Sequence, residues 1–116
     1  MNNPAQKPAI FDAILVDDDP LVESTWRLLA KKAGKRLSIF TCGEELLAKV
    51  DNFDVCTPVY IDFALPQDKM QGVELARELH RRGFRELYLS TGQHKDDIPA
   101  VDVVKEIRGK NPPWKI

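Results

Sequence analysis

The sequence predicts an α/β fold, in which a parallel β-sheet is covered by helices on both faces. Short apolar runs with the length of buried strands alternate along the chain with segments whose apolar residues recur at helical spacing. Several of these runs end in acidic or hydroxyl residues, and the carboxyl ends of parallel strands are where ligands bind in such folds. We therefore expect one domain with a site at one edge of its sheet.

The first strand is predicted at residues 11–16, and a helix follows the acids that come after it. The run is apolar, rich in strand-forming residues and too short for a helix. Asp19 is a typical N-cap residue and Pro20 suits the first helical position, while Gly34 is typical of a helix end. These signals predict a helix that begins at Pro20 and ends at Gly34.

The second strand is predicted at residues 37–40, before a short helix. Thr41 is suited to cap that helix, and Glu44, three residues later, would complete a capping box. The leucines that follow have helical spacing, so we expect the helix to pack one apolar side on the sheet.

A third buried strand is predicted at residues 59–61, directly before Asp62. The next segment, residues 72–82, has apolar residues on one helical stripe and is stopped by Gly83. A strand followed by a helix of this length again indicates a parallel sheet.

The pattern is weaker in the last third of the chain. A fourth strand is predicted at residues 87–89, ending in the sequence Ser-Thr-Gly at 90–92, and a fifth strand at residues 103–107. Between them, residues 94–100 have room for at most one or two helical turns. Residues 109–116 contain two adjacent prolines and cannot begin another long helix.

Composition narrows the classes of function. We expect residues 1–9 to be a flexible lead-in and residues 10–116 to form the domain. A net charge of −1 without a basic block argues against direct binding of nucleic acid. Cys42 and Cys56 lack metal-ligand spacing and suit a reducing compartment. With no apolar run approaching the ~18–20 residues of a membrane span and no signal peptide, we expect a cytoplasmic protein without membrane insertion.

Acidic and hydroxyl residues follow three of the predicted strands. Asp17 and Asp18 follow the first, Asp62 the third, and Ser90 and Thr91 the fourth. If the first and third strands are neighbours, three carboxylates and a hydroxyl meet at one rim. Hard oxygen ligands without His or thiolate suit Mg²⁺. A carboxylate beside such a metal can also act as nucleophile and form an aspartyl-phosphate.

Five motifs occur in the order found in a known family. They are ILVDDDP, VYIDFALP, MQGVELAREL, LYLSTG and GKNPP, and the similarity spans residues 10–113. On these motifs the sequence resembles a response-regulator receiver domain, the phosphoacceptor module of two-component signalling, and it could be the C-terminal receiver of a hybrid sensor kinase. The resemblance implies a flavodoxin-like, doubly wound sheet of five parallel strands in the order 2-1-3-4-5. In this sequence the fourth helix would be short and the last helix missing.

The resemblance also implies roles for the acids. Asp18 would bind Mg²⁺ directly and Asp17 mainly through water. Asp62 matches the aspartate that is phosphorylated and also contributes to the metal site. Ala64, two residues later, would give the metal its backbone carbonyl. Asp19 would cap the helix beside this site and not bind the metal.

Two further positions have competing candidates. Thr91 matches the hydroxyl that meets the phosphoryl group when the domain switches, with Ser90 as the alternative if the register slips by one residue. Lys110 matches the lysine that pairs with the phosphate, because the sequence Asn-Pro-Pro follows it. Lys105 is the competitor, although a glutamate follows it directly.

The function that the resemblance implies is transfer of a phosphoryl group from a histidine kinase or phosphotransfer domain onto Asp62, with Mg²⁺ as cofactor. Such a domain catalyses its own phosphorylation and dephosphorylation but is not a stand-alone enzyme. One alternative is a receiver-like module that signals by binding alone. A second is a Mg²⁺-dependent phosphohydrolase, which is disfavoured because Ala64 occupies the place of its second acid.

The sequence also departs from the family pattern. Two extra residues, Asp68 and Lys69, displace the usual Met-x-Gly motif. The weak fourth helix and the missing last helix affect the face through which receivers commonly dimerise, so we do not expect the usual receiver dimer. Trp26 has the spacing of a packing residue. Trp114 could cover apolar surface left by the missing helix or lie against a partner.

Overall fold

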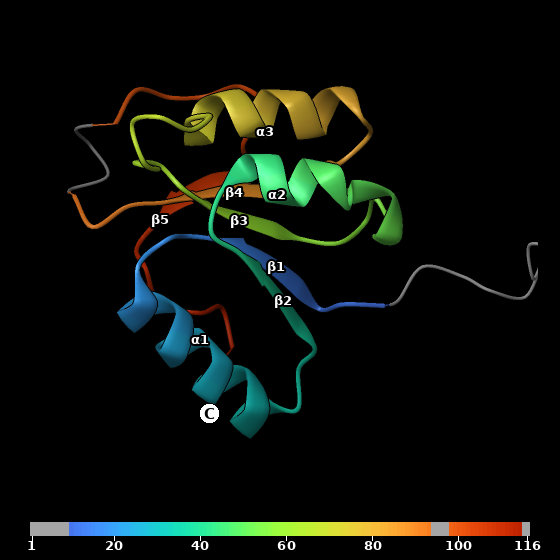
Figure 1. Ribbon diagram of the computed structural model, residues 1–116, viewed down its shortest axis with the longest axis vertical. Coiled ribbons are helices and arrows are strands. Elements are labelled where there is room, and N and C mark those ends of the chain that lie inside the picture. Colours follow the sequence, from blue (N-terminus) through green and yellow to red (C-terminus); the bar gives the residue numbers. More distant parts are fainter. Residues whose placement is uncertain (1–9, 94–97, 115–116) are drawn as a thin grey trace, which may run out of the picture.

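The computed structural model describes residues 10–93 and 98–114. In chain order its elements are β1 (Ala13–Val16), α1 (Pro20–Ala33), β2 (Leu37–Phe40), α2 (Gly43–Ala48), the 3-10 helix η1 (Val50–Asn52), β3 (Val59–Asp62), α3 (Gly72–Arg81), β4 (Leu87–Ser90) and β5 (Glu106–Arg108). The strands form one parallel sheet in the order β2-β1-β3-β4-β5 (Figure 1). This arrangement confirms the predicted fold class and strand order.

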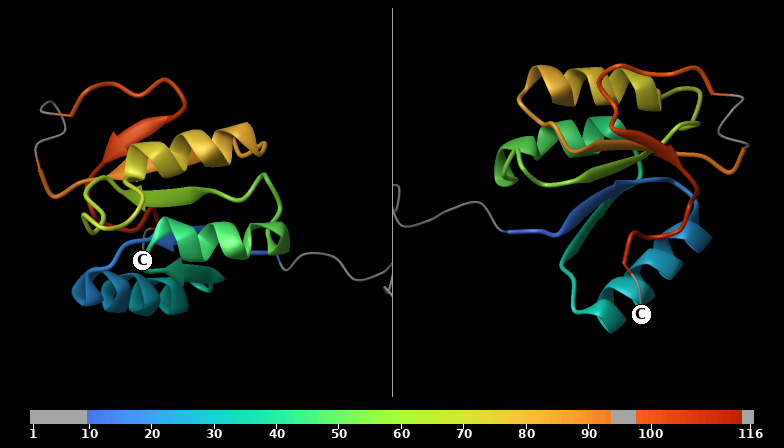
Figure 2. Two further views of the ribbon diagram at one scale, coloured as in Figure 1. Left: turned by 45° about the horizontal axis from the view of Figure 1, so that its top comes forward. Right: turned by 180° about the vertical axis from the view of Figure 1, so that it is seen from behind.

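Helices lie on both faces of the sheet. α1 covers one face, and α2 and α3 lie together on the other (Figure 1 and Figure 2). Successive residues of a strand point to opposite faces. In β1, Ile14 and Val16 therefore belong to the larger core cluster beneath α2 and α3, whereas Ala13 and Leu15 belong to a smaller cluster around Trp26 of α1. Burial of a Val, Leu or Ile side chain contributes about 1.5–3 kcal/mol, so the layers on both faces stabilise β1.

Aromatic side chains fill the smaller cluster. Tyr60 of β3 stacks on Tyr88 of β4 with ring centroids 4.7 Å apart. Trp26 lies 5.3 Å from the Tyr60 ring and meets Trp114 edge to face at 5.5 Å. Trp26 is fully buried, as its helical spacing predicts. Trp114 therefore covers apolar surface of its own chain, one of the two roles that the sequence left open.

The ends of α1 follow the sequence signals. The Asp19 side chain accepts a hydrogen bond of 2.9 Å from the backbone N–H of Leu21, and Pro20 occupies the first turn. Gly34 ends the helix in the left-handed conformation, with φ of 68°. Because residues with a Cβ rarely adopt this conformation, glycine suits the position.

The predicted cap of the second helix is wrong. α2 begins at Gly43, so Cys42 and not Thr41 stands at its N-cap. Glu45 accepts hydrogen bonds from the backbone N–H and the hydroxyl of Thr41, at 3.0 and 2.6 Å. Glu44 instead accepts from a backbone N–H outside the helix, as described below. The helix starts one residue later than predicted, which moves each of these side chains out of the capping positions.

The fifth strand is displaced from its prediction. β5 comprises Glu106–Arg108, whereas the sequence predicted residues 103–107. Val103 and Val104 pack against the larger core cluster from a loop, and the backbone N–H of Val104 bonds to the carbonyl of Val101 at 3.2 Å in a turn. Their apolar character therefore reflects side-chain packing on the sheet and not membership of a strand.

Some predictions fall on segments outside the described residues. The lead-in at residues 1–9 lies there, as do residues 94–97 of the segment that could hold a short fourth helix. The described remainder of that segment, residues 98–100, is not helical. Within residues 10–93 and 98–114, no helix is both long enough and apolar enough to cross a membrane.

Candidate functional site

Three acidic side chains meet at the carboxyl ends of β1 and β3. These strands are neighbours in the sheet; Asp17 and Asp18 follow β1, and Asp62 is the last residue of β3. One carboxylate oxygen from each acid lies within 4.8 Å of those of the other two. Asp17 is 1% exposed and Asp62 6% exposed, whereas Asp18 is open to solvent. Asp17, Asp18 and Asp62 thus lie together at the carboxyl edge of the sheet, as the strand order predicts. We call this cluster the acidic rim.

Lys110 balances part of this negative charge. Its Nζ lies 2.8 Å from Oδ2 of Asp17 and 2.8 Å from Oδ1 of Asp62. Burial raises the pKa of the Asp62 carboxyl above its ordinary value, although the hydrogen bond from Lys110 acts in the opposite direction. Burial alone would lower the pKa of Lys110, but its hydrogen bonds to Asp17 and Asp62 outweigh that effect, so its pKa is raised and it stays a cation.

Backbone groups orient the two buried carboxylates. The N–H of Asp19 donates to Oδ1 of Asp17 at 2.9 Å, and the N–H of Ala64 donates to Oδ1 of Asp62 at 3.1 Å. Both oxygens of Asp17 are therefore engaged. Among the described residues, no hydrogen bond reaches Oδ2 of Asp62. Of these two carboxylates, Asp62 is the one with an oxygen free to attack an electrophile.

The two candidate hydroxyls differ in their surroundings. Ser90 pairs in register with Asp62 across β3 and β4, and its Oγ is buried without a hydrogen-bond partner in the described part of the chain. Thr91 lies one residue beyond, and its Oγ1 accepts a hydrogen bond of 3.0 Å from the N–H of Gln93. A buried hydroxyl without a partner costs about 1–3 kcal/mol. Ser90 is thus the hydroxyl with a free hydrogen-bonding capacity beside Asp62.

The two candidate lysines differ in their contacts and in their distance from the acids. Lys105 forms an ion pair with Glu86, and about half of the Lys105 side chain is exposed. Lys110, by contrast, contacts two of the three acids. The structure therefore brings Lys110 into the acidic site and leaves Lys105 on the surface.

Gly72 allows α3 to start directly against the backbone of Asp62. A Cβ at position 72 would lie 2.4 Å from the Asp62 carbonyl oxygen and 3.2 Å from Cα of Phe63. Real side chains do not approach backbone atoms this closely, so only glycine fits without a shift. The sequence identified Gly72 as part of a motif, but the steric reason depends on how α3 packs.

Gln71 organises the loop that carries the two extra residues. Its side-chain amide nitrogen lies 3.1, 3.0 and 3.2 Å from the carbonyl oxygens of Leu65, Pro66 and Lys69. Sequence reasoning did not identify Gln71; the only signal was a polar residue just before a helix.

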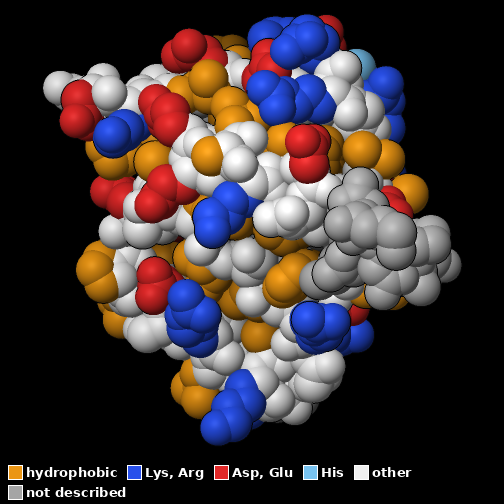
Figure 3. Space-filling view, turned by 45° about the vertical axis from the view of Figure 1, so that its right-hand side comes forward, with side chains coloured by type: hydrophobic (Ala, Val, Ile, Leu, Met, Phe, Trp, Pro, Cys, Tyr) orange, Lys and Arg blue, Asp and Glu red, His pale blue; other side chains and the backbone are white. Residues whose placement is uncertain are grey.

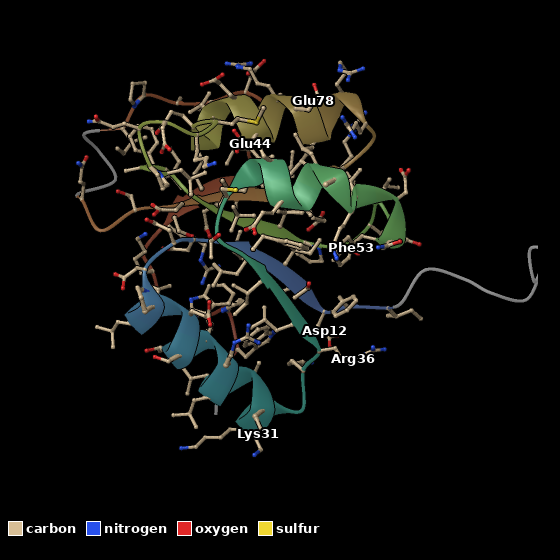
Figure 4. The ribbon with its side chains drawn as sticks, viewed as in Figure 1. Asp12, Lys31, Arg36, Glu44, Phe53 and Glu78 are labelled. Carbon is tan, nitrogen blue, oxygen red and sulfur yellow. The ribbon has the colours of Figure 1, made fainter. Side chains whose placement is uncertain are left out.

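The same loop is also held from α2. Glu44, labelled on α2 in Figure 4, accepts a hydrogen bond of 3.0 Å from the N–H of Met70. This bond lowers the pKa of the exposed Glu44 carboxyl. The longer loop is thus tied at both ends beside the acidic rim.

The acidic rim fits a divalent cation chemically. Three carboxylates face one ammonium group, so negative charge remains in excess. The donors are hard oxygens, without His or Cys among them, which favours Mg²⁺ over softer metals. Carboxylates held this close repel by about 1–4 kcal/mol per pair, and a bound cation would relieve that repulsion.

Unlike the three acids of the site, the basic side chains on one face of the molecule are not gathered in a single cluster. Figure 3 brings the right-hand side of Figure 1 forward, and on that face Lys and Arg lie in several separate groups, some next to acids. Arg81 and Arg82 at the end of α3 both pair with Glu78. These arginines hold the pKa of Glu78 down at about 2.

No family model and no curated protein matches the sequence. Solved structures do match, among them the response regulator StyR, at 23% identity and a TM-score of 0.69, covering 89% of this chain. The chain spans about half, 52%, of the length of StyR.

Two further structures are similar over most of their own length. A CheY-like receiver domain from Methanospirillum hungatei has 20% identity and a TM-score of 0.71, with 92% of this chain and 85% of that chain covered. The response regulator TrrA from Thermotoga maritima, solved in complex with Mg²⁺ and BeF, has 21% identity and a TM-score of 0.69, with 86% of each chain covered. The chain therefore has the fold of response-regulator receiver domains.

Proposed function

We propose that this chain is a phosphoacceptor receiver domain of a two-component phosphorelay. Asp62 takes a phosphoryl group from a histidine kinase or a phosphotransfer domain in a Mg²⁺-dependent reaction, and the domain then changes conformation. The observation that carries the proposal is the contact of Lys110 with both Asp17 and Asp62 inside an acidic cluster, at the ligand-binding edge of a receiver fold.

The metal would be held by carboxylate oxygens. Asp18 would bind Mg²⁺ directly, Asp17 mainly through water, and Asp62 and the backbone carbonyl of Ala64 would complete the protein ligands. When bound, the cation neutralises charge on the transferred phosphoryl group. The buried Asp17 keeps its orientation through the N–H of Asp19, so the ligand set is prepared in advance.

The protein's own residues would carry out the transfer. The free Oδ2 of Asp62 forms a bond to phosphorus, and the bond between phosphorus and the donor's histidine nitrogen breaks, leaving its electron pair on that nitrogen. Lys110 moves from the Asp62 carboxylate to a phosphoryl oxygen. Ser90, whose Oγ has no partner among the described residues, donates a hydrogen bond to the phosphoryl group; Thr91 is the alternative.

The proposal includes a cytoplasmic location and a signalling role. Cys42 and Cys56 are both free thiols, which agrees with a reducing compartment. The domain would act as part of a relay, taking up and releasing its own phosphoryl group, and not as a stand-alone enzyme.

Phosphorylation by a small donor tests the proposal. Incubated with acetyl phosphate and Mg²⁺, the protein should gain one acid-stable, base-labile phosphoryl group, visible by intact mass and absent from Asp62→Asn. Lys110→Ala should impair beryllofluoride binding more than its control Lys105→Ala, and Ser90→Ala more than Thr91→Val. Phosphorylation that persists in Asp62→Asn would rule out this mechanism. A folded, metal-bound protein that takes no phosphoryl group would instead favour the interaction-module alternative.

A further inference from the structure

Lys110 lies in a segment without regular secondary structure. It follows the end of β5 at Arg108, and residues 109–114 belong to no helix or strand. A long, flexible side chain on such a segment has many conformations, so bringing its Nζ to 2.8 Å from two carboxylates requires that the backbone be held. The question is which residue holds it.

Trp26 of α1 contacts this segment at two points. Its indole Nε1 donates a hydrogen bond of 2.8 Å to the backbone carbonyl of Lys110, across 84 residues of sequence. Its ring meets the Trp114 ring edge to face at 5.5 Å. Trp26 is fully buried, so its N–H requires an acceptor, and that acceptor is the carbonyl of Lys110.

α1 also begins directly after the acidic residues that follow β1. Asp19 caps α1, and the N–H of Asp19 orients the Asp17 carboxylate. α1 is therefore connected to the acidic rim at its N-cap, Asp19, and to Lys110 through Trp26. A single rigid element can in this way fix the distance between the lysine and the acids.

We propose that Trp26 is a positioning residue for Lys110: its indole N–H, and not only its ring, sets where the ammonium group lies. The contact supplies an anchor for the segment that follows β5. The consequence for phosphoryl transfer rests on the proposed function, whereas the positioning itself does not.

The matched pair of variants is Trp26→Phe and Trp114→Phe. Both remove an indole N–H and keep an aromatic ring in the cluster, but among the described residues only the Trp26 indole donates a hydrogen bond. Replacement of Trp26 by β-(3-benzothienyl)alanine, which keeps the two-ring shape and lacks the N–H, serves as a second variant if Trp26→Phe is poorly folded.

The first readout is the ammonium resonance of Lys110 in ¹⁵N NMR. Its two carboxylate partners should slow proton exchange enough to make it visible in the unmodified protein and in Trp114→Phe. We expect it to broaden or disappear in both Trp26 variants while the amide spectrum still shows a folded domain. An unchanged Lys110 resonance in these variants would overturn the proposal, whether or not the protein is ever phosphorylated.

The second readout is a double-mutant cycle on phosphorylation. Trp26→Phe should slow the reaction with acetyl phosphate by about fivefold, the rate equivalent of one lost hydrogen bond. In a Lys110→Ala background the same change should have no further effect, because the group that it positions is gone. Equal slowing in both backgrounds would show that Trp26 acts through general packing. If the unmodified protein takes up no phosphoryl group, the proposed function is refuted. The NMR result then decides the role of Trp26 by itself.

Discussion

At the level of single residues, Lys110 is what allows two buried carboxylates to lie side by side in the fold. Asp17 and Asp62 are almost fully buried, and both accept from the Lys110 ammonium. Leaving a buried charge without its partner typically costs about 3–5 kcal/mol. The contact with Lys110 therefore stabilises the acidic rim, in addition to the role in phosphate binding that we propose for this lysine.

Substitutions of the neighbouring acids Asp18 and Asp19 should affect different properties, metal binding in the first case and helix capping in the second. Mg²⁺ should raise the free energy of unfolding of the unmodified protein by mass action. In Asp18→Ala that increase should vanish. Asp19→Ala should keep it and lose about 1 kcal/mol of stability, because the Asp19 carboxylate no longer accepts a hydrogen bond from the N–H of Leu21. Urea denaturation with and without Mg²⁺ measures both effects. Equal loss of the Mg²⁺ effect in the two variants would show that Asp19 is also a ligand.

The sequence predicted the members of the rim better than the contacts between them. Strand ends predicted the acids, because their meeting depends on strand order, and the resemblance of the GKNPP motif predicted Lys110. The contact of Trp26 with Lys110 spans 84 residues and involves a backbone carbonyl, so no local pattern reveals it. Ser90 and Thr91 are adjacent, and only the pairing of β3 with β4 shows that Ser90 lies opposite Asp62.

At the level of elements, the start of α3 is fixed by its contact with the end of β3. Cβ atoms are excluded at Gly72 by the Asp62 carbonyl oxygen, whereas a Cβ at Gly92 would meet no atom within 4 Å. Neither of these glycines has a backbone conformation restricted to glycine. The two positions thus differ in space and not in backbone strain.

Gly72→Ala should therefore destabilise the domain by about 1–3 kcal/mol, the range for inserting a methyl group into a packed site. It should also weaken Mg²⁺ binding, because the backbone that must move belongs to Asp62. Gly92→Ala is the control and should change the free energy of unfolding by less than about 1 kcal/mol. Denaturation and Mg²⁺ titration of both variants test this; equal stabilities would mean that α3 adjusts its position without cost.

The elements also show where local patterns fail. Valines 101, 103 and 104 have the composition of a strand but pack on the core from a loop, so β5 begins later than predicted. Thr41 and Glu44 have the spacing of a capping box, but the N-cap is Cys42, one residue further on. In both cases tertiary packing decides the boundary, and a short sequence window does not contain that information.

At the level of the whole molecule, the two faces of the sheet are covered unequally. Within residues 10–93 and 98–114, α1 is the one helix on its face, and the aromatic cluster of Trp26, Tyr60, Tyr88 and Trp114 covers part of the rest. No helix of the described residues lies between β4 and β5. The proposed receiver would thus have, among its described residues, no helix between β4 and β5 at the face through which receivers commonly dimerise.

We accordingly expect no dimer built on β5 when the domain is activated. Sedimentation velocity with Mg²⁺, before and after addition of beryllofluoride, should give the same mass. Asp62→Asn is the control that cannot respond to beryllofluoride. A beryllofluoride-dependent dimer that a charge reversal at Glu106 disrupts would contradict this expectation.

The contacts of Lys110 also have a kinetic consequence for folding. Lys110 and Asp17 are 93 residues apart in sequence, so almost the whole chain must be in place before their ion pair forms. Contacts of such long range commonly form after the transition state, and removing them then speeds unfolding more than it slows folding. In stopped-flow experiments, Lys110→Met should raise the unfolding rate constant and leave the refolding rate constant nearly unchanged. A markedly slower refolding rate would place this pair in the folding nucleus. If the expectation holds, the lysine that we propose to contact the phosphoryl group also determines the lifetime of the folded domain.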